Sequence, residues 1–273
     1  LQFSQKMHLP DNIQLQKCTT CDFAFVTPAD KAAYEAYYAS ARTDLIHDER
    51  DATQVNGWIR TQAPAFETLL AQPSPLHVLD FGCGGGNLLK MLATNHPQHQ
   101  FVGFDMHSEQ RRDDLSNVTF THDLAPHKGA CNLVILSHVL EHFADLNTLQ
   151  SVIDLLTPDG ILYIEVPNPA RYTQSPQREF LFFIDRMHLT HFSPKAMLVL
   201  AERFGLDMQR YGTLALPYRD GGTYPSHYFF FSKGTGSALD DIDSYITHEK
   251  ARPSPLAELA PKTPILIYGF GDN

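Results

Sequence analysis

The sequence lacks long hydrophobic runs and contains little cysteine. No stretch of about 18 consecutive apolar residues occurs, so no transmembrane helix is expected. No basic segment followed by an apolar one stands at the amino terminus, which argues against a secretory signal. Four cysteines among 273 residues do not make a disulfide framework. We therefore expect a cytoplasmic chain without a membrane partner.

Basic residues are also scarce. The chain has 21 Lys and Arg against 31 Asp and Glu, which leaves a formal net charge of −10, and no basic stripe is visible. This balance argues against a nucleic acid as the partner, because phosphate backbones are bound by clustered positive charge. We expect a small-molecule substrate instead, and the sequence does not indicate an oligomeric state.

From residue 76 onwards, short apolar segments alternate with amphipathic ones. The predicted strands are His77–Phe81, Gln100–Phe104, Val118–Thr121, Asn132–Ser137, Gly160–Val166, Gly205–Leu216 and His227–Ser232. Helices are predicted before and between them, at 29–47, 52–72, 88–95, 146–156 and 194–204, the last capped by Ser193. Strands separated by helices indicate an α/β fold with a mostly parallel sheet. The last two predicted strands have no helix between them, so they should form an antiparallel hairpin.

The two ends differ from this central pattern. Residues 1 to about 30 look polar and irregular, and the chain starts at Leu1 rather than Met. Residues 263–273 look like a buried strand that runs into a Gly-x-Gly turn and then stops. We predict three parts: an amino-terminal lobe over 1–50, a catalytic domain over 51–235, and over 236–273 a linker with the start of a truncated Rossmann-like unit. A fragment of a longer protein is therefore expected.

A glycine-rich loop follows the first strand of the predicted sheet. Glycine stands at positions 82, 84 and 86, directly behind Asp80. Glycine permits positive φ and close approach of a ligand to the backbone, and ligands of open α/β sheets bind at this carboxyl edge. A dinucleotide loop of the G-x-G-x-x-G type would need glycine at 87, where this chain has Asn87. The carboxylate of Asp80 favours a cationic ligand over a pyrophosphate.

Two further acids follow the next strands. Asp105 ends the second strand, where a carboxylate can accept two hydrogen bonds from ribose hydroxyls. Asp123 follows the third strand, where its carboxylate can accept a hydrogen bond from the amino group of an adenine. The fourth strand runs into the segment from Ser137 to His142. The pattern therefore indicates a cationic cofactor that contains an adenosine.

Taken in order, these motifs resemble the class I S-adenosylmethionine-dependent methyltransferases over roughly residues 50–235. The resemblance implies a Rossmann-like, seven-stranded sheet with an antiparallel last strand. It also implies S-adenosylmethionine as the cofactor. Its implied binding residues are the loop residues Asp80, Gly82, Cys83, Gly84 and Gly86 for the methionine part, Asp105 and neighbouring Met106 for the ribose, Asp123 and Leu124 for the adenine, and Ser137 and His138 beside the sulfonium and the substrate.

The sequence around this core resembles more closely the sugar C-methyltransferases. These enzymes have an amino-terminal zinc-binding lobe and a carboxyl-terminal Rossmann-like domain. Cys18 and Cys21 match one cysteine pair of such a helical, zinc-ribbon-like lobe. One pair supplies half of a zinc site. Zinc is accordingly a candidate second cofactor, and free thiols are the alternative.

Three histidines are candidate catalytic residues, because methyl transfer to a protonated acceptor needs a base. In the sugar C-methyltransferases a catalytic histidine stands where this chain has His188. Met187 takes the place of the acid that precedes that histidine, and His191 takes the place of the aromatic residue that usually follows it. His138 is the second candidate and His191 the third. A purely structural role for His188 remains open. For Glu141, capping of a short helix is favoured over catalysis, and a metal site made of residues 138, 141 and 142 is disfavoured.

The sequence thus predicts a methyltransferase that acts on a sugar-like or nucleotide-linked biosynthetic substrate, with a histidine as general base. Two alternatives remain. One is an O- or N-methyltransferase of a quinone-like or other secondary metabolite, with the same cofactor. The other is a cofactor-binding domain without catalytic activity.

Overall fold

The computed structural model describes residues 14–27, 52–105, 115–174, 188–217 and 222–234. The predicted helix at 29–47 lies outside these ranges, as do Met106, Met187 and residues 235–273. In the described parts of the chain, no helix is both long and apolar enough to cross a membrane.

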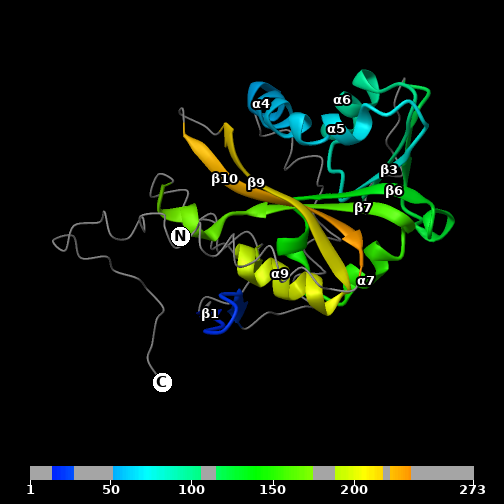
Figure 1. Ribbon diagram of the computed structural model, residues 1–273. Helices are drawn as coiled ribbons and strands as arrows, with labels where there is room; N and C mark the ends of the chain where they lie inside the picture. The colour runs from blue at the N-terminus through cyan, green and yellow to red at the C-terminus, as the bar shows by residue number, and fades with distance from the viewer. Residues whose placement is uncertain (1–13, 28–51, 106–114, 175–187, 218–221, 235–273) are drawn as a thin grey trace.

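One seven-stranded sheet organises the structure (Figure 1). From one edge to the other its strands are β5 (Val118–Thr121), β4 (Gln100–Phe104), β3 (His77–Phe81), β6 (Cys131–Ser137), β7 (Leu156–Pro167), β10 (Thr223–Lys233) and β9 (Leu206–Pro217). The pairs from β5 to β7 are parallel, whereas β10 is antiparallel to both of its neighbours. The predicted fold class and the predicted terminal hairpin are therefore confirmed.

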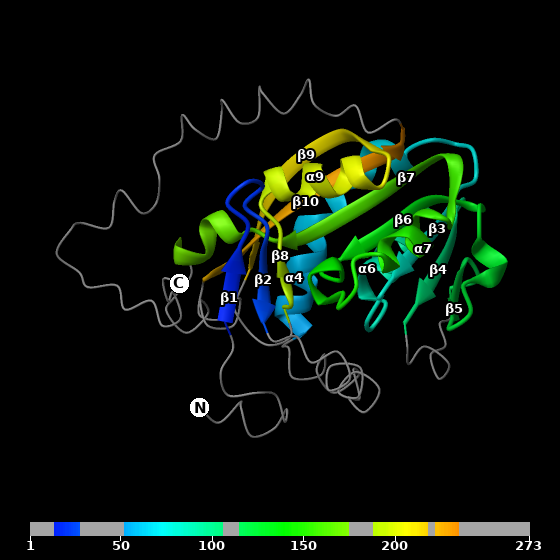
Figure 2. The same cartoon turned by 90° about the horizontal axis from the view of Figure 1, so that it is seen from below.

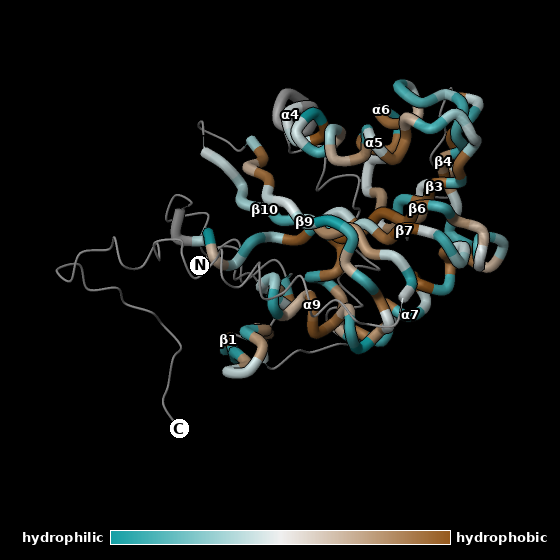
Figure 3. Tube along the Cα trace, in the orientation of Figure 1, coloured by the Kyte–Doolittle hydropathy of each residue, from teal (hydrophilic) through white to brown (hydrophobic). Residues whose placement is uncertain are grey.

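Helices cover both faces of this sheet (Figure 1). On one side lie α4 (Ala52–Gln62), the 3-10 turn η1 (Ala63–Ala65), α5 (Glu67–Leu70) and α6 (Asn87–Asn95), and on the other side lie α7 (Thr148–Ile153) and α9 (Pro194–Arg203). Alternation along β6 explains the two layers: Leu133 and Ile135 belong to one buried cluster, and Val134 and Leu136 belong to the other. Hydrophobic segments accordingly concentrate on the central strands in Figure 3.

The predicted helices differ from the observed ones in two places. The expected helix at 52–72 is divided, because Pro64 lies in the turn η1 between α4 and α5. The expected helix at 146–156 is shorter, because Leu156 pairs with Cys131 and already belongs to β7. The cap of α9 is confirmed: the Ser193 side chain accepts the N–H of Ala196 at 3.1 Å.

The described amino-terminal segment is a hairpin, so the expectation of an irregular segment there was wrong. Strands β1 (Gln14–Lys17) and β2 (Ala24–Thr27) are antiparallel, and β2 also pairs with β8 (Thr190–His191). These three strands form a second small sheet (Figure 2). The sequence signal was weak because both hairpin strands are short, β1 is largely exposed, and β2 pairs with a strand far along the chain.

Three further 3-10 turns complete the carboxyl edge of the sheet. They are η3 (Ala125–His127) after β5, η4 (Leu140–His142) after β6, and η5 (Pro169–Gln174) after β7. The loop between β3 and α6 lies at the same edge, because parallel strands end on the same side. The described residues that were predicted to bind the cofactor therefore come from neighbouring strand ends, whereas His188, His191, Cys18 and Cys21 belong to the small sheet or adjoin it.

Candidate functional site

The glycine loop folds back onto the end of β4. Gly82, Gly84 and Gly86 all have positive φ, of 76°, 51° and 72°. The N–H groups of Gly82 and Cys83 donate to the Phe104 carbonyl at 2.7 and 3.0 Å. The N–H of Gly84 donates to a carboxylate oxygen of Asp105 at 3.1 Å. The loop and Asp105 therefore form one cradle.

The loop also packs too closely for larger residues. A Cβ atom at Gly82 would lie 2.6 Å from a methyl carbon of Val139, the residue after His138. A Cβ atom at Gly86 would lie 2.8 Å from the ring of Phe120 in β5. Hence the glycines bring the loop into contact with the strand ends on both sides.

Asp80 is buried at the end of β3, with 3% of its surface exposed. Burial, and then the nearby charge of Asp105, raise the pKa of Asp80 to about 7. A positively charged ligand next to such a carboxyl group would stabilise its ionised form. The geometry therefore fits a cationic ligand in the loop.

The two residues predicted to bind the adenine, Asp123 and Leu124, are held differently. Asp123 is exposed, and its carboxylate accepts the N–H of Ala125 at 2.9 Å, so it orders the turn after β5. Leu124 is partly buried against the core cluster that includes Leu136. Met106 lies outside the described residues.

His138 lies between two carboxylates. Its Nδ1 is 3.2 Å from Glu141 Oε1, and its Nε2 is 3.2 Å from Glu165 Oε1. Burial tends to lower the pKa of His138, but Glu165 and Glu141 outweigh that effect and raise it to about 9. The imidazole therefore already carries a proton at neutral pH. Its backbone has φ 56°, which is uncommon for a residue with a side chain.

Glu165 is a central residue that the sequence analysis missed. It is fully buried in β7, and its Oε2 accepts hydrogen bonds from Gln62 at 2.8 Å, from Tyr163 at 2.8 Å and from Ser137 at 3.3 Å. The signal in the sequence was a single acid within the otherwise apolar segment 161–166. Ser137, predicted beside the cofactor, is thus also part of a buried network.

Aromatic rings enclose the other side of His138. The rings of Trp58 and Tyr224 lie 5.5 and 5.3 Å from the imidazole, and 5.0 Å from each other. Trp58 comes from α4 and Tyr224 from β10, so this wall joins the two ends of the described methyltransferase fold. Neither ring was predicted to be near the site.

His188 and His191 have different surroundings. His188 is 6% exposed, and burial followed by the neighbouring His142 lower its pKa to about 3. His191 lies in β8, where its Nδ1 is 2.9 Å from the Tyr172 hydroxyl, and burial lowers its pKa to about 4. Both imidazoles are therefore neutral near pH 7.

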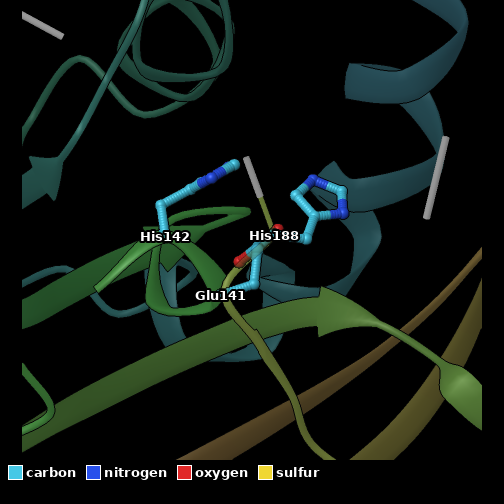
Figure 4. Close-up of side chains that lie close together, drawn as sticks. All are labelled: Glu141, His142 and His188. Carbon is cyan, nitrogen blue, oxygen red and sulfur yellow. The ribbon is translucent and has the colours of Figure 1, made fainter. Parts of the chain in front are cut away.

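Glu141 does not act as a cap, contrary to expectation: it is the second residue of η4, whose N-cap position is Val139, and that turn has no side-chain cap. Its carboxylate points instead toward His138, His142 and His188. Burial tends to raise the pKa of Glu141, but these imidazoles hold it at about 2. Figure 4 shows Glu141, His142 and His188 together, although His188 is far along the chain from the other two.

Cys18 and Cys21 lie in the turn between β1 and β2, both partly buried and reduced. The N–H of Cys18 donates to the Phe23 carbonyl at 2.7 Å, and the N–H of Asp22 donates to the Cys18 carbonyl at 3.0 Å. Among the residues that the structure describes, no third metal-ligating side chain joins this pair. The predicted zinc site finds no support here.

Comparisons with known proteins agree with this geometry. Residues 56–211 match the family described as the methyltransferase domain. Trans-aconitate 2-methyltransferase of Acidovorax sp. (strain JS42) is 32% identical over 116 residues, which are 38% of this chain and 44% of that protein. The match spans less than half of the length of this curated relative.

Two solved structures show the same fold. One is a Burkholderia thailandensis 1,6-didemethyltoxoflavin-N1-methyltransferase, with a TM-score of 0.56 at 17% identity over 81% of this chain and 99% of that chain. The other is the magnesium protoporphyrin IX methyltransferase of Synechocystis PCC 6803, with a TM-score of 0.54 at 16% identity over 74% and 99%. With the family match extending over more than half of its length, this chain belongs to the methyltransferase-domain family.

Proposed function

We propose that this chain transfers a methyl group from S-adenosylmethionine to a small-molecule biosynthetic substrate, with a sugar-like or nucleotide-linked acceptor as the first candidate. The observation that carries the proposal is the cradle of the glycine loop and Asp105, with Asp80 buried behind it. S-adenosylmethionine supplies an electrophilic methyl group on a sulfonium cation. A buried acid next to a left-handed glycine loop suits that charge and its methionine part.

In this proposal, the residues at neighbouring strand ends bind different parts of the cofactor. We assign the ribose to Asp105, and its hydrogen bond with the loop at Gly84 supports this assignment. We assign the adenine to Asp123 at the next strand end, and the ordered turn from Thr121 to Ala125 supports this assignment. This assignment follows the order of the strands in the sheet, β3, β4 and β5.

On the acceptor side, the histidines have different chemical roles. His138 is protonated between Glu141 and Glu165, so it positions and donates rather than abstracts a proton. His191, in β8 of the small sheet, is hydrogen-bonded to Tyr172 of η5, which favours a structural role. His188 is the neutral imidazole at the carboxyl edge, and we place it next to the acceptor.

A small carboxylate is the second candidate acceptor. The identity of 32% with a trans-aconitate 2-methyltransferase favours it over an amine acceptor. The quinone-like and secondary-metabolite acceptors stay alternatives with the same cofactor site. A panel of sugar nucleotides, phenols and small carboxylates separates these acceptor classes.

Calorimetry with S-adenosylmethionine, S-adenosylhomocysteine and NAD tests the proposal. We expect the first two to bind and NAD to give no heat. Asp105→Asn should weaken cofactor binding about tenfold, because a charge-assisted hydrogen bond is lost. Transfer of a radiolabelled methyl group to the acceptor panel then tests catalysis. Binding without transfer to any acceptor would favour a non-catalytic domain, and no binding at all would refute the proposal.

A further inference from the structure

Glu141, His142 and His188 bring three potential metal ligands together at the carboxyl edge of the sheet. The two imidazoles lie on either side of the carboxylate (Figure 4), and one ligand atom from each residue lies within 4.8 Å of the other two. Among the residues that the structure describes, this is the one group of three such side chains. We propose that these residues bind a divalent metal ion. Two histidines and one carboxylate form a ligand set that Zn²⁺ and Fe²⁺ use.

The carboxylate of Glu141 gives an independent reason to expect a ligand. Glu141 is 1% exposed. Its Oε1 is paired with His138 at 3.2 Å, whereas its Oε2 is buried and accepts no hydrogen bond from any residue in the described part of the chain. A buried carboxylate oxygen without a donor is costly. A cation between Oε2 and the two imidazoles would satisfy it.

A supporting set of residues fixes the direction of this carboxylate. The imidazole of His138 is hydrogen-bonded through Nε2 to Glu165 and through Nδ1 to Oε1 of Glu141. Residues behind metal ligands commonly act in this way, because they orient the ligand before the metal arrives. The hydrogen bonds from Glu165 through His138 to Glu141 therefore engage Oε1 and leave Oε2 of the same carboxylate without a donor, in the group that includes the two histidines.

The backbone positions of the ligands are fixed as well. In η4, the N–H of His142 donates to the Val139 carbonyl at 3.0 Å. His188 precedes β8, whose Thr190 hydroxyl donates to the Leu140 carbonyl at 3.4 Å. Ligand atoms around a zinc ion lie about 3–3.5 Å apart, given metal–ligand distances of about 2.1 Å. Small side-chain rotations would close the present spacing.

The location of the cluster suggests its use, and this step rests on the proposed function. Val139 lies between His138 and η4 and touches the glycine loop at Gly82, so the cluster is close to the cofactor cradle. Three protein ligands leave coordination positions open for an acceptor oxygen. A bound hydroxyl loses its proton to solvent more readily, and its oxygen then attacks the methyl carbon. The O–CH3 bond forms, the S–CH3 bond breaks, and S-adenosylhomocysteine leaves.

Zn²⁺ and Fe²⁺ with open coordination positions bind oxygen donors. The acceptor class that follows has an oxygen nucleophile, a hydroxyl or a carboxylate, rather than an amine.

Calorimetric titration of the chelator-treated chain with Zn²⁺ and with Co²⁺ tests the site. The titration uses both the wild type and a Cys18→Ser, Cys21→Ser variant, so that the thiols do not contribute. We expect one ion per chain in the thiol-free variant. Adding Glu141→Gln or His142→Gln should weaken binding by at least about 100-fold, since each removes one of three ligands. The visible spectrum of the Co²⁺ form should change in both.

The matched control is His77→Gln combined with His127→Gln. These two rings are 5.2 Å apart near the opposite end of β3, so they test whether any histidine pair binds the ions. The control variant should bind Zn²⁺ and Co²⁺ with unchanged affinity. Equal affinity in the Glu141 and His142 variants, or no ion bound by the folded chain, would overturn the inference.

Binding of S-adenosylmethionine, measured in the same samples, separates the two proposals. A chain that binds S-adenosylmethionine but neither Zn²⁺ nor Co²⁺ contradicts the metal site alone. A chain that binds Zn²⁺ through Glu141 and His142 but does not bind S-adenosylmethionine contradicts the proposed function alone.

Discussion

Asp80 carries a carboxyl group that the fold buries at the end of β3, beside Asp105. Its pKa of about 7 in the folded chain lies above the value of about 3.9 in an unfolded chain. Because the folded state holds this proton more tightly, the contribution of Asp80 to stability is complete below about pH 4. It is lost as the pH rises toward 7.

Asp80→Asn should therefore remove a pH dependence. Between pH 5 and pH 8, the free energy of unfolding of the wild type should fall by about 2–3 kcal/mol relative to that of the variant. Urea denaturation of both proteins, without cofactor, at the two pH values measures this difference. Parallel pH profiles for the two proteins would contradict the raised pKa.

Glu165 is the residue whose loss should cost most stability in the site. Glu165→Gln keeps the shape but removes the charge that balances His138. It also replaces one carboxylate oxygen with an NH2 group, so a single oxygen must serve either His138 or the donors Gln62 and Tyr163. Breaking a buried ion pair on one side costs about 3 kcal/mol, and denaturation at pH 7 should show a loss of this order. In the control, Glu67→Gln removes a half-exposed carboxylate 3.6 Å from His96 and should cost less than about 0.5 kcal/mol.

At the scale of elements, the sequence predicted the strands better than the helices. The bounds of β3, β4 and β5 were predicted as observed, because each is a short apolar run with clear ends. The helix before β7 was overextended, since Leu156 is apolar in either state and its strand pairing is a tertiary contact. The hairpin of β1 and β2 was missed for the same reason: its partner β8 lies far along the chain.

The loop between β3 and α6 allows a test of its backbone requirement. Gly82→Ala forces a side chain into positive φ and against Val139, so the loop must shift. We expect the affinity for S-adenosylmethionine to fall at least tenfold, measured by calorimetry. Gly129→Ala is the control: its φ is 67°, but nothing lies within 4 Å of the added Cβ. The control should lose stability by about 1–3 kcal/mol and still bind the cofactor normally.

At the scale of the whole molecule, the site joins residues that the sequence separates widely. The order of glycines and acids along the chain assigns the cofactor to the ends of β3, β4 and β5, and the structure brings these three strand ends to one edge of the sheet. It did not predict that His188 lies beside Glu141 and His142, or that Trp58 and Tyr224 lie beside His138. Such proximities follow from the packing of distant elements, which local patterns do not encode.

The small sheet is the element that ties the amino-terminal hairpin to this site. The N–H of Val26 in β2 donates to the Leu189 carbonyl at 2.9 Å, next to His188, and Val26 is buried. Val26→Pro removes that donor and should destabilise the chain by about 2–3 kcal/mol. Hydrogen exchange at residues 189–192 should become faster, because β8 loses its partner strand.

Val26→Ala is the control for this change, since it keeps the donor and loses only side-chain packing. It should destabilise the chain, but hydrogen exchange at residues 189–192 should become faster only as much as the overall loss of stability predicts. If the two variants give equal exchange there, the hairpin does not hold the segment that carries His188. If only the proline variant speeds exchange and also weakens Zn²⁺ binding, then the amino-terminal hairpin supports the proposed metal site through β8.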